Sequence, residues 1–351
     1  MGLLLKPAGL DICANADTFL QSELWGRFKE RFGWKAFAFS CGYENEEQPL
    51  LVLFRRLNAL FSFAYVPWGP RLPAGVNGAE VQNYLLQVAV ELRKQLPPAT
   101  AFIRFDPPWY TANTAELSAP FTRSAADVQP PDSVLIDLGA GEEEILGGMK
   151  SKWRYNIGLA AKKGVQVRCA EASSPQFEKD LESYYRLYRE TAQRDGISIH
   201  GVEYYRGLFD LAGGTEAARL RLYMASHEGE DIAGVITIFR KREAVYLYGA
   251  SSSRKRNLMA PYALQWQAMR DAKKSLCAYY DLFGIPPVSP EEDPRHPMAG
   301  LYRFKTGFGG TIIHRPGSWN YRCRPLLTAL FSAAEGMRKK IWTIGKRNRR
   351  T

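Results

Sequence analysis

Residues 245–305 hold strand, turn, helix and strand in an order that few folds accommodate. A strand-like segment at 245–248 meets a Gly-Ala-Ser-Ser-Ser turn, and Pro261 opens an amphipathic segment with apolar residues at helical spacing. A second strand, 278–283, carries Asp281 near its end, and a Pro-rich acidic loop leads to a cationic loop at 301–305. This order predicts a mixed α/β fold around which the rest of the chain can be read.

A similar order of elements occurs on each side of residue 148. The first half shows helix 17–30 with Asp17 as its N-cap, strands 36–41, 50–54 and 61–66, helix 81–96 and strand 101–105. The second half shows helix 177–195, strands 219–227, 231–240 and 244–249, then the helix and strand described above. We therefore predict two similar domains, one of residues 1–147 with 312–351 and one of residues 148–311.

The composition is basic, with 47 Lys and Arg against 36 Asp and Glu, a net charge of +11. Such a charge attracts phosphates, nucleic acid or an anionic membrane, and does not choose among them. Five scattered cysteines without CxxC or Cys/His spacing predict free thiols in a cytoplasmic protein and no metal site. No apolar run is long enough to predict a membrane span.

Six stretches, taken together, resemble the Fem family of peptidoglycan-bridge aminoacyltransferases of the GNAT superfamily. They follow the family order at 21–25 (QSELW) with Lys29, 103–107 (IRFDP), 152–165, 246–251 (YLYGAS), 279–285 (YYDLFGI) and 300–305 (GLYRFK). The resemblance implies two GNAT-like domains with a cleft between them and no coiled-coil arm. It also implies transfer of an amino acid from aminoacyl-tRNA to the side-chain amine of a muropeptide stem, without a cofactor. The acceptor would be lipid II or UDP-MurNAc-pentapeptide.

The resemblance also assigns residues to the reaction. Lys305 and Asp106 would be catalytic, and Lys29, Tyr204, Tyr248, His200 and Phe304 would bind substrate. In the family an arginine at the position of His200 contacts the acceptor's phosphates, and a tyrosine occupies the position of Ala101. These two departures leave the identity of the acceptor open.

The chemistry of acyl transfer gives these residues distinct tasks. Attack of an amine on an ester passes through a tetrahedral oxyanion, which the Lys305 ammonium would stabilise; the alternative is a surface lysine capping a strand. Asp106 would bind or deprotonate the amine, or else cap a turn before Pro107. Tyr204 and Tyr248 would donate to the acceptor, or else be core aromatics with one polar end.

Two basic segments predict contact with polyanions. A helix within 146–163 would follow the tRNA acceptor stem with Lys150, Lys152, Arg154, Lys162 and Lys163, unless it is only a solvated face. The end from Pro325 combines apolar and basic residues with no acid after Glu335, which predicts peripheral contact with an anionic membrane or else a packing helix. We expect a monomer.

Two other classes of function stay open from the sequence. An acyl-CoA-dependent GNAT N-acyltransferase would bind pyrophosphate at residues 255–260, where Leu258 occupies a position that glycine holds in that class. Arg254 and Lys255 could compensate for the missing glycine. A non-catalytic protein that binds tRNA or membrane is the second alternative.

Overall fold

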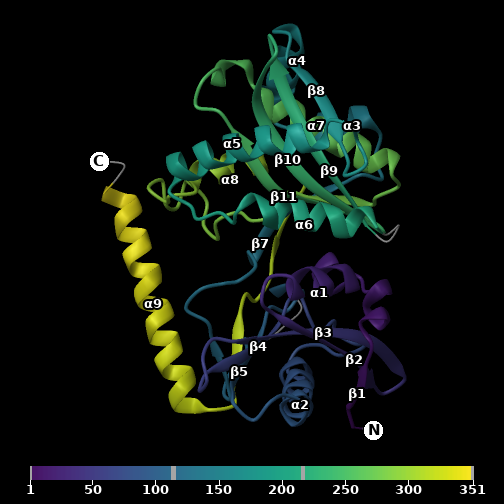
Figure 1. The fold of residues 1–351 in the computed structure, drawn as a ribbon, viewed down its shortest axis with the longest axis vertical. Helices are drawn as coiled ribbons and strands as arrows, with labels where there is room; N and C mark the ends of the chain where they lie inside the picture. The colour runs from purple at the N-terminus through teal and green to yellow at the C-terminus, as the bar shows by residue number, and fades with distance from the viewer. Residues whose placement is uncertain (1, 112–115, 215–217, 349–351) are drawn as a thin grey trace. The chain divides into compact units, whose positions relative to one another are not determined.

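The computed structural model describes residues 2–111, 116–214 and 218–348, and for residues 338–348 it describes the backbone only. The chain forms two compact units (Figure 1), residues 1–131 with 313–351 and residues 132–312. Each unit contains one mixed sheet, which confirms the predicted α/β class. The described helices include no long two-helix arm, as expected.

In the described chain, the first unit has a sheet of seven strands in the order β1-β2-β3-β4-β5-β14-β6. Its elements are β1 (Leu4–Ala8), α1 (Glu23–Glu30), β2 (Lys35–Tyr43), β3 (Glu46–Arg56), β4 (Ser62–Val66), α2 (Glu80–Gln95), β5 (Thr100–Phe105), β6 (Phe121–Arg123), β14 (Trp319–Arg322) and α9 (Pro325–Asn348). Strands β1 to β4 pair antiparallel, whereas β4 and β5 pair parallel because α2 returns the chain across the sheet. Strand β14 completes the sheet between β5 and β6.

The second unit repeats this plan, with the order β13-β7-β12-β11-β10-β9-β8 among its described strands. Its elements are β7 (Asp132–Asp137), α3 (Glu142–Gly148), α4 (Ser151–Lys162), β8 (Gln166–Ala170), α5 (Phe177–Asp195), α6 (Val202–Gly213), β9 (Arg219–His227), β10 (Glu230–Arg240), β11 (Glu243–Ser251), α7 (Ala260–Lys274), β12 (Tyr279–Asp281), α8 (Ala299–Thr306) and β13 (Thr311–His314). Strands β8 to β11 pair antiparallel, and α7 leads to β12, which pairs parallel with β11. The duplicated order predicted from the sequence is thus present in the topology.

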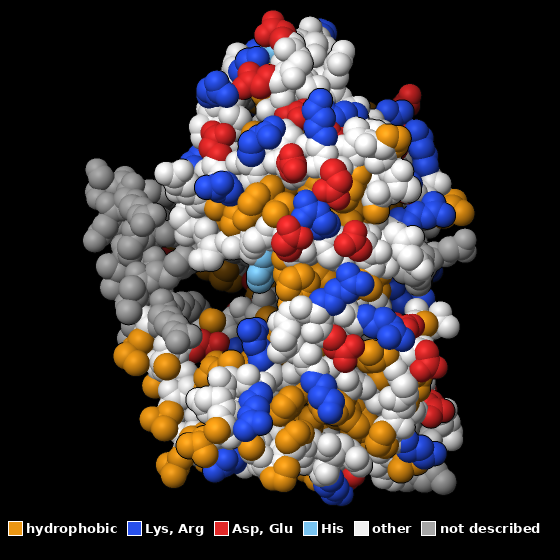
Figure 2. All heavy atoms as spheres, in the orientation of Figure 1, with side chains coloured by type: hydrophobic (Ala, Val, Ile, Leu, Met, Phe, Trp, Pro, Cys, Tyr) orange, Lys and Arg blue, Asp and Glu red, His pale blue; other side chains and the backbone are white. Residues whose placement is uncertain are grey.

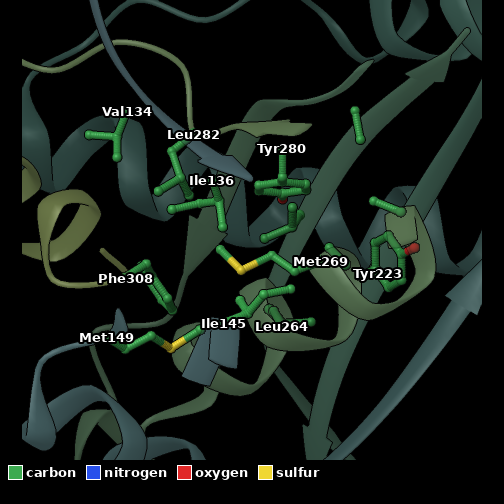
Figure 3. Packing of buried hydrophobic residues seen from close by; sticks show 14 of the residues in the cluster. Val134, Ile136, Ile145, Met149, Tyr223, Leu264, Met269, Tyr280, Leu282 and Phe308 are labelled. Carbon is green, nitrogen blue, oxygen red and sulfur yellow. The ribbon is translucent and has the colours of Figure 1, made fainter. Parts of the chain in front are cut away.

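The core of the second unit fixes the helix that bears Lys305. Figure 3 shows Ile136 of β7 and Leu282, just after β12, gathered with Leu264 and Met269 of α7 and with Phe308. Burying one such side chain stabilises a fold by about 1.5–3 kcal/mol. Phe308 lies directly after α8, so this core holds the end of the helix that carries the lysine.

Several sequence predictions need correction. The helix expected over 17–30 starts only at Glu23, because Ser22 rather than Asp17 is its N-cap and accepts a hydrogen bond from the Trp25 N–H at 3.2 Å. The expected loop at 301–305 is the helix α8. Residues 132–147 belong to the second unit, because β7 pairs with β12. Strands β1, β6, β13 and β14 were not predicted.

Candidate active site

Lys305 lies on α8, and its side chain is buried rather than presented on a loop. The residue is 6% exposed. Its Nζ donates hydrogen bonds to the backbone oxygens of Phe283 and Gly284, the latter at 2.9 Å. The ammonium also lies 5.1 Å from the centre of the Tyr246 ring. A surface lysine capping a strand, the alternative left open by the sequence, does not describe this environment.

The irregular segment after β12 supplies the two carbonyls. Phe283 and Gly284 are both in the left-handed region, with φ of 52° and 56°, and the backbone oxygens of both accept from the same ammonium. Asp281 Oδ1 accepts hydrogen bonds from the Phe283 N–H at 2.7 Å and from the Ser133 hydroxyl. The sequence placed Asp281 at a strand end but gave it no role, and nothing pointed to Ser133, 148 positions away.

The surroundings of Lys305 control its protonation. Burial lowers its pKa to about 7, and the nearby Asp281 carboxylate opposes that shift. An ammonium has three N–H donors, and two are used by the Phe283 and Gly284 carbonyls. Within the described residues, the third has no acceptor. It can therefore donate to an oxygen that becomes negative during a reaction.

A tyrosine cluster in the same unit contains three of the predicted substrate-binding residues. His200 stacks on Tyr204 of α6, with ring centres 3.8 Å apart. Tyr204 shares a side-chain hydrogen bond with Tyr248 of β11, and Tyr205 packs edge-on against Tyr248 at 5.2 Å. Burial raises the pKa of Tyr204 to about 12, so this phenol stays protonated at neutral pH and can donate a hydrogen bond.

A bulge in β11 separates the two tyrosines of that strand. Tyr246 pairs with Thr237 and Tyr248 pairs with Ile236, so Leu247 is the extra residue. Bulges redirect side chains and are frequent beside active sites. Gly249 follows, and a Cβ there would come within 1.8 Å of the Tyr246 hydroxyl oxygen. This close approach explains the glycine in the YLYGAS stretch.

Lys29 and Asp106 lie in the first unit, connected through aromatic rings. Lys29 Nζ is 5.8 Å from the Trp34 ring, and Trp34 contacts Tyr65, with ring centres 6.3 Å apart. The Tyr65 hydroxyl donates to Asp106 Oδ2 at 2.6 Å. Burial, and to a smaller extent the charge of Arg55, lowers the pKa of Lys29 to about 8. Lys29 is thus a partly desolvated cation, a state suited to binding an anion.

Asp106 is a buried carboxylate at the end of β5, 3% exposed. Besides Tyr65, the Gln129 N–H at 3.1 Å and the Ser318 hydroxyl donate to it. Burial raises its pKa to about 6, although these three donors favour the ionised form. These bonds join the strand end to two later segments, so Asp106 has a structural task whether or not it meets substrate.

Phe304, predicted to bind substrate, packs against other aromatic rings of the second unit. The ring centres of Tyr262 and Phe308 each lie 5.2 Å from that of Phe304, so this residue helps to fix the position of α8.

The cations of the basic helix are mostly exposed. Those exposed on or beside α4 are Lys150, Lys152, Arg154 and Lys162. Lys163 is half-buried, and its Nζ lies 2.9 Å from the Asn257 backbone oxygen. The apolar side of this helix packs on the core through Trp153 and Ile157, and Ala160 is buried.

In the segment expected to bind CoA phosphates, a buried leucine takes the place of the glycine, and two cations already form ion pairs. Leu258 is 7% exposed and packs into the core of the second unit. Arg254 Nη2 lies 2.7 Å from Glu230, and Lys255 Nζ lies 3.0 Å from the same carboxylate. The two cations that could compensate for the missing glycine are therefore already paired.

Two units of one topology give this chain the architecture of a tandem GNAT-like fold. The chain belongs to the FemAB family, whose model matches residues 111–226 and 214–336. It is an aminoacyltransferase of that family. Among the described helices, none is both long and apolar enough to cross a bilayer.

Curated relatives agree with the family, and solved structures share the fold. A lipid II:glycine glycyltransferase of Staphylococcus aureus strain COL is 21% identical over 86% of this chain and 87% of its own length. One from Staphylococcus epidermidis RP62A has the same identity and coverage. The crystal structure of FemX matches with a TM-score of 0.74 at 18% identity over 92% of this chain and 97% of that one. A tandem GNAT protein of the clavulanic acid pathway matches with a TM-score of 0.50 at 12% identity, over 91% of this chain and 98% of that one.

Proposed function

We propose that the protein transfers an amino acid from aminoacyl-tRNA to the side-chain amine of a peptidoglycan stem peptide, carried by lipid II or UDP-MurNAc-pentapeptide. The observation that carries the proposal is the buried Lys305 ammonium with one N–H left to donate. The FemAB match and the names of the staphylococcal relatives support the class of acceptor.

The chemical step follows from this ammonium. The acceptor amine attacks the ester carbonyl, the carbonyl oxygen becomes an oxyanion, and Lys305 donates its remaining hydrogen bond to that oxygen. The ester C–O bond then breaks, an amide forms, and the proton lost by the amine goes to the departing ribose oxygen. Tyr204 and Tyr248 would orient the acceptor, Asp106 would bind its amine, and Lys29 would pair with its phosphates. Contact of the tRNA with the five cations on and beside α4 also stays a prediction.

Mass spectrometry tests the proposal directly. The protein is incubated with bulk charged tRNA and with UDP-MurNAc-pentapeptide or lipid II, and the acceptor is weighed. We expect a mass gain of one or more amino-acid residues that disappears when the tRNA is deacylated first. A gain that needs an acyl-CoA instead of charged tRNA, or no gain with either acceptor, would refute the proposal.

A further inference from the structure

The outward side of the first turns of α9 is apolar and exposed. Leu326, Leu330 and Met337 are 83%, 69% and 60% exposed. Their spacing of four and seven residues places them on one side of the helix. The other side packs on the first unit through Phe331, which stacks on Phe61 at 5.4 Å. The helix therefore has two apolar sides, and the fold buries only one of them.

The loop between β3 and β4 adds to this exposed surface. Leu57 and Leu60 are 49% and 77% exposed, and residues 57–61 line one groove together with Leu327 and Leu330 of α9. Figure 2 shows hydrophobic side chains gathered at the lower left, in the part of the first unit where α9 begins. We call Leu57, Leu60, Leu326, Leu330 and Met337 the α9 patch. Contiguous exposed apolar surface of this kind marks a contact site.

The charges around the α9 patch are positive. Glu335, the sole acid in 325–351, accepts hydrogen bonds from both terminal nitrogens of Arg104, at 2.8 and 2.9 Å, and is 18% exposed. This carboxylate is turned inward and neutralised. Arg56 and Arg324 are exposed beside the two leucine segments. After Met337 the sequence adds seven more Lys and Arg residues and no acid.

We propose that the α9 patch binds the surface of a lipid bilayer that contains anionic lipids. Exposed leucines enter the boundary between headgroups and acyl chains, while the surrounding arginines meet anionic headgroups. A nucleic acid offers the same negative charge but no apolar layer for five exposed side chains. The purpose of this contact rests on the proposed function, because a lipid-linked acceptor is held in a membrane.

Co-sedimentation of the full-length protein with vesicles tests the proposal. Vesicles of phosphatidylcholine alone are compared with vesicles that also contain phosphatidylglycerol, at low and high salt. We expect binding to the anionic vesicles that weakens with salt, and a loss of about tenfold in Leu60→Ser/Leu326→Ser/Leu330→Ser. Leu276→Ser is the matched control, because Leu276 is 86% exposed in the other unit.

A second measurement does not depend on the triple variant folding. An environment-sensitive fluorophore on Leu330→Cys, in a Cys169→Ser background, should shift to the blue with anionic vesicles, whereas the same label on Leu276→Cys should not. Equal binding by the triple variant, an unshifted label, or self-association that only the triple variant loses would overturn the proposal. These vesicles contain no donor or acceptor, and transfer to soluble UDP-MurNAc-pentapeptide tests the proposed function separately.

Discussion

Burying a lysine costs free energy unless hydrogen-bond acceptors or opposite charges compensate for the lost water, and for Lys305 they compensate only in part. Two backbone carbonyls accept from its ammonium, and the Tyr246 ring lies near it. Desolvation nevertheless lowers the pKa of Lys305 to about 7, so its charge can change near neutral pH. A structural role accounts for the two N–H groups that bind the Phe283 and Gly284 carbonyls, and leaves the third N–H without a task.

Replacing Lys305 with methionine should therefore abolish chemistry before it abolishes folding. Methionine keeps the length of the side chain and removes the donor to the oxyanion, and we expect transfer to fall by about 10²–10³. Single-turnover transfer, with tRNA binding measured beside it, separates the chemical step from binding. Arg303→Met on the exposed side of the same helix is the control and should stay near wild type. A Lys305→Met enzyme within tenfold of wild type would contradict the proposed role.

The pH dependence of the same step gives a second test. Deprotonation removes the positive charge and the third N–H, the one that the Phe283 and Gly284 carbonyls leave unused, so transfer should decline as pH rises through about 7, the pKa of Lys305. In Lys305→Arg the guanidinium stays protonated, and the decline should disappear even though the maximal rate is lower. Rates at saturating acceptor, corrected for spontaneous ester hydrolysis, are compared from acid to alkaline pH. An unchanged decline in the arginine variant would assign it to another group.

At the scale of elements, helices and strands with a clear apolar spacing in the sequence were predicted, and those without one were missed. Helix α2 was expected at 81–96, and its buried residues recur at helical spacing. Helix α8 was missed because its apolar signal spans fewer than two turns after a Pro-rich loop. Strand β14, of four residues, was missed because its partners β5 and β6 lie about 200 positions away. The carbonyls that hold Lys305 were missed for a related reason: tertiary contact alone brings them together.

Asp281, at the end of β12, should tune the pKa of Lys305. The Asp281 carboxylate raises the lysine pKa against the larger effect of burial. Asp281→Asn keeps an acceptor for the Phe283 N–H but removes the charge, so the lysine pKa should fall and the alkaline decline should move to lower pH. Ser133→Ala keeps the charge, and its decline should stay near 7 while the rate drops modestly. The pH–rate profiles of the two variants decide this; coincident profiles would exclude the electrostatic role of Asp281.

At the scale of the whole molecule, the two units share a topology and also a buried hydrogen bond between an aspartate and a serine, which we call the clamp. Asp106 follows β5 and Asp281 ends β12, the parallel strand of each unit. Each aspartate accepts a hydrogen bond from a serine on the neighbouring antiparallel segment, Ser318 and Ser133 respectively. No sequence identity between the halves revealed this correspondence, because each clamp joins residues far apart in the chain. The two clamps differ in what they adjoin: Asp106 accepts from Tyr65, and Asp281 accepts from Phe283, whose carbonyl holds Lys305.

The clamp of the first unit predicts a pH-dependent change in stability. The folded pKa of Asp106, about 6, exceeds its ordinary value of 3.8, so the native state loses stability as pH rises from about 4 to about 6, by about 3 kcal/mol in full. Asp106→Asn cannot ionise, and its amide can still accept from Tyr65 and Gln129 while donating to the Ser318 hydroxyl. Its thermal midpoint, relative to wild type, should therefore rise across this range and change little below it.

The same variant separates the two tasks that Asp106 can have. If the carboxylate also binds the acceptor amine, Asp106→Asn should lose about 10²-fold in transfer at pH 7 while the protein becomes more stable. That opposition of activity and stability is what a buried group retained for chemistry should show. Transfer within twofold of wild type, with the stability change present, would leave Asp106 as a clamp like Asp281 and assign the amine to other groups.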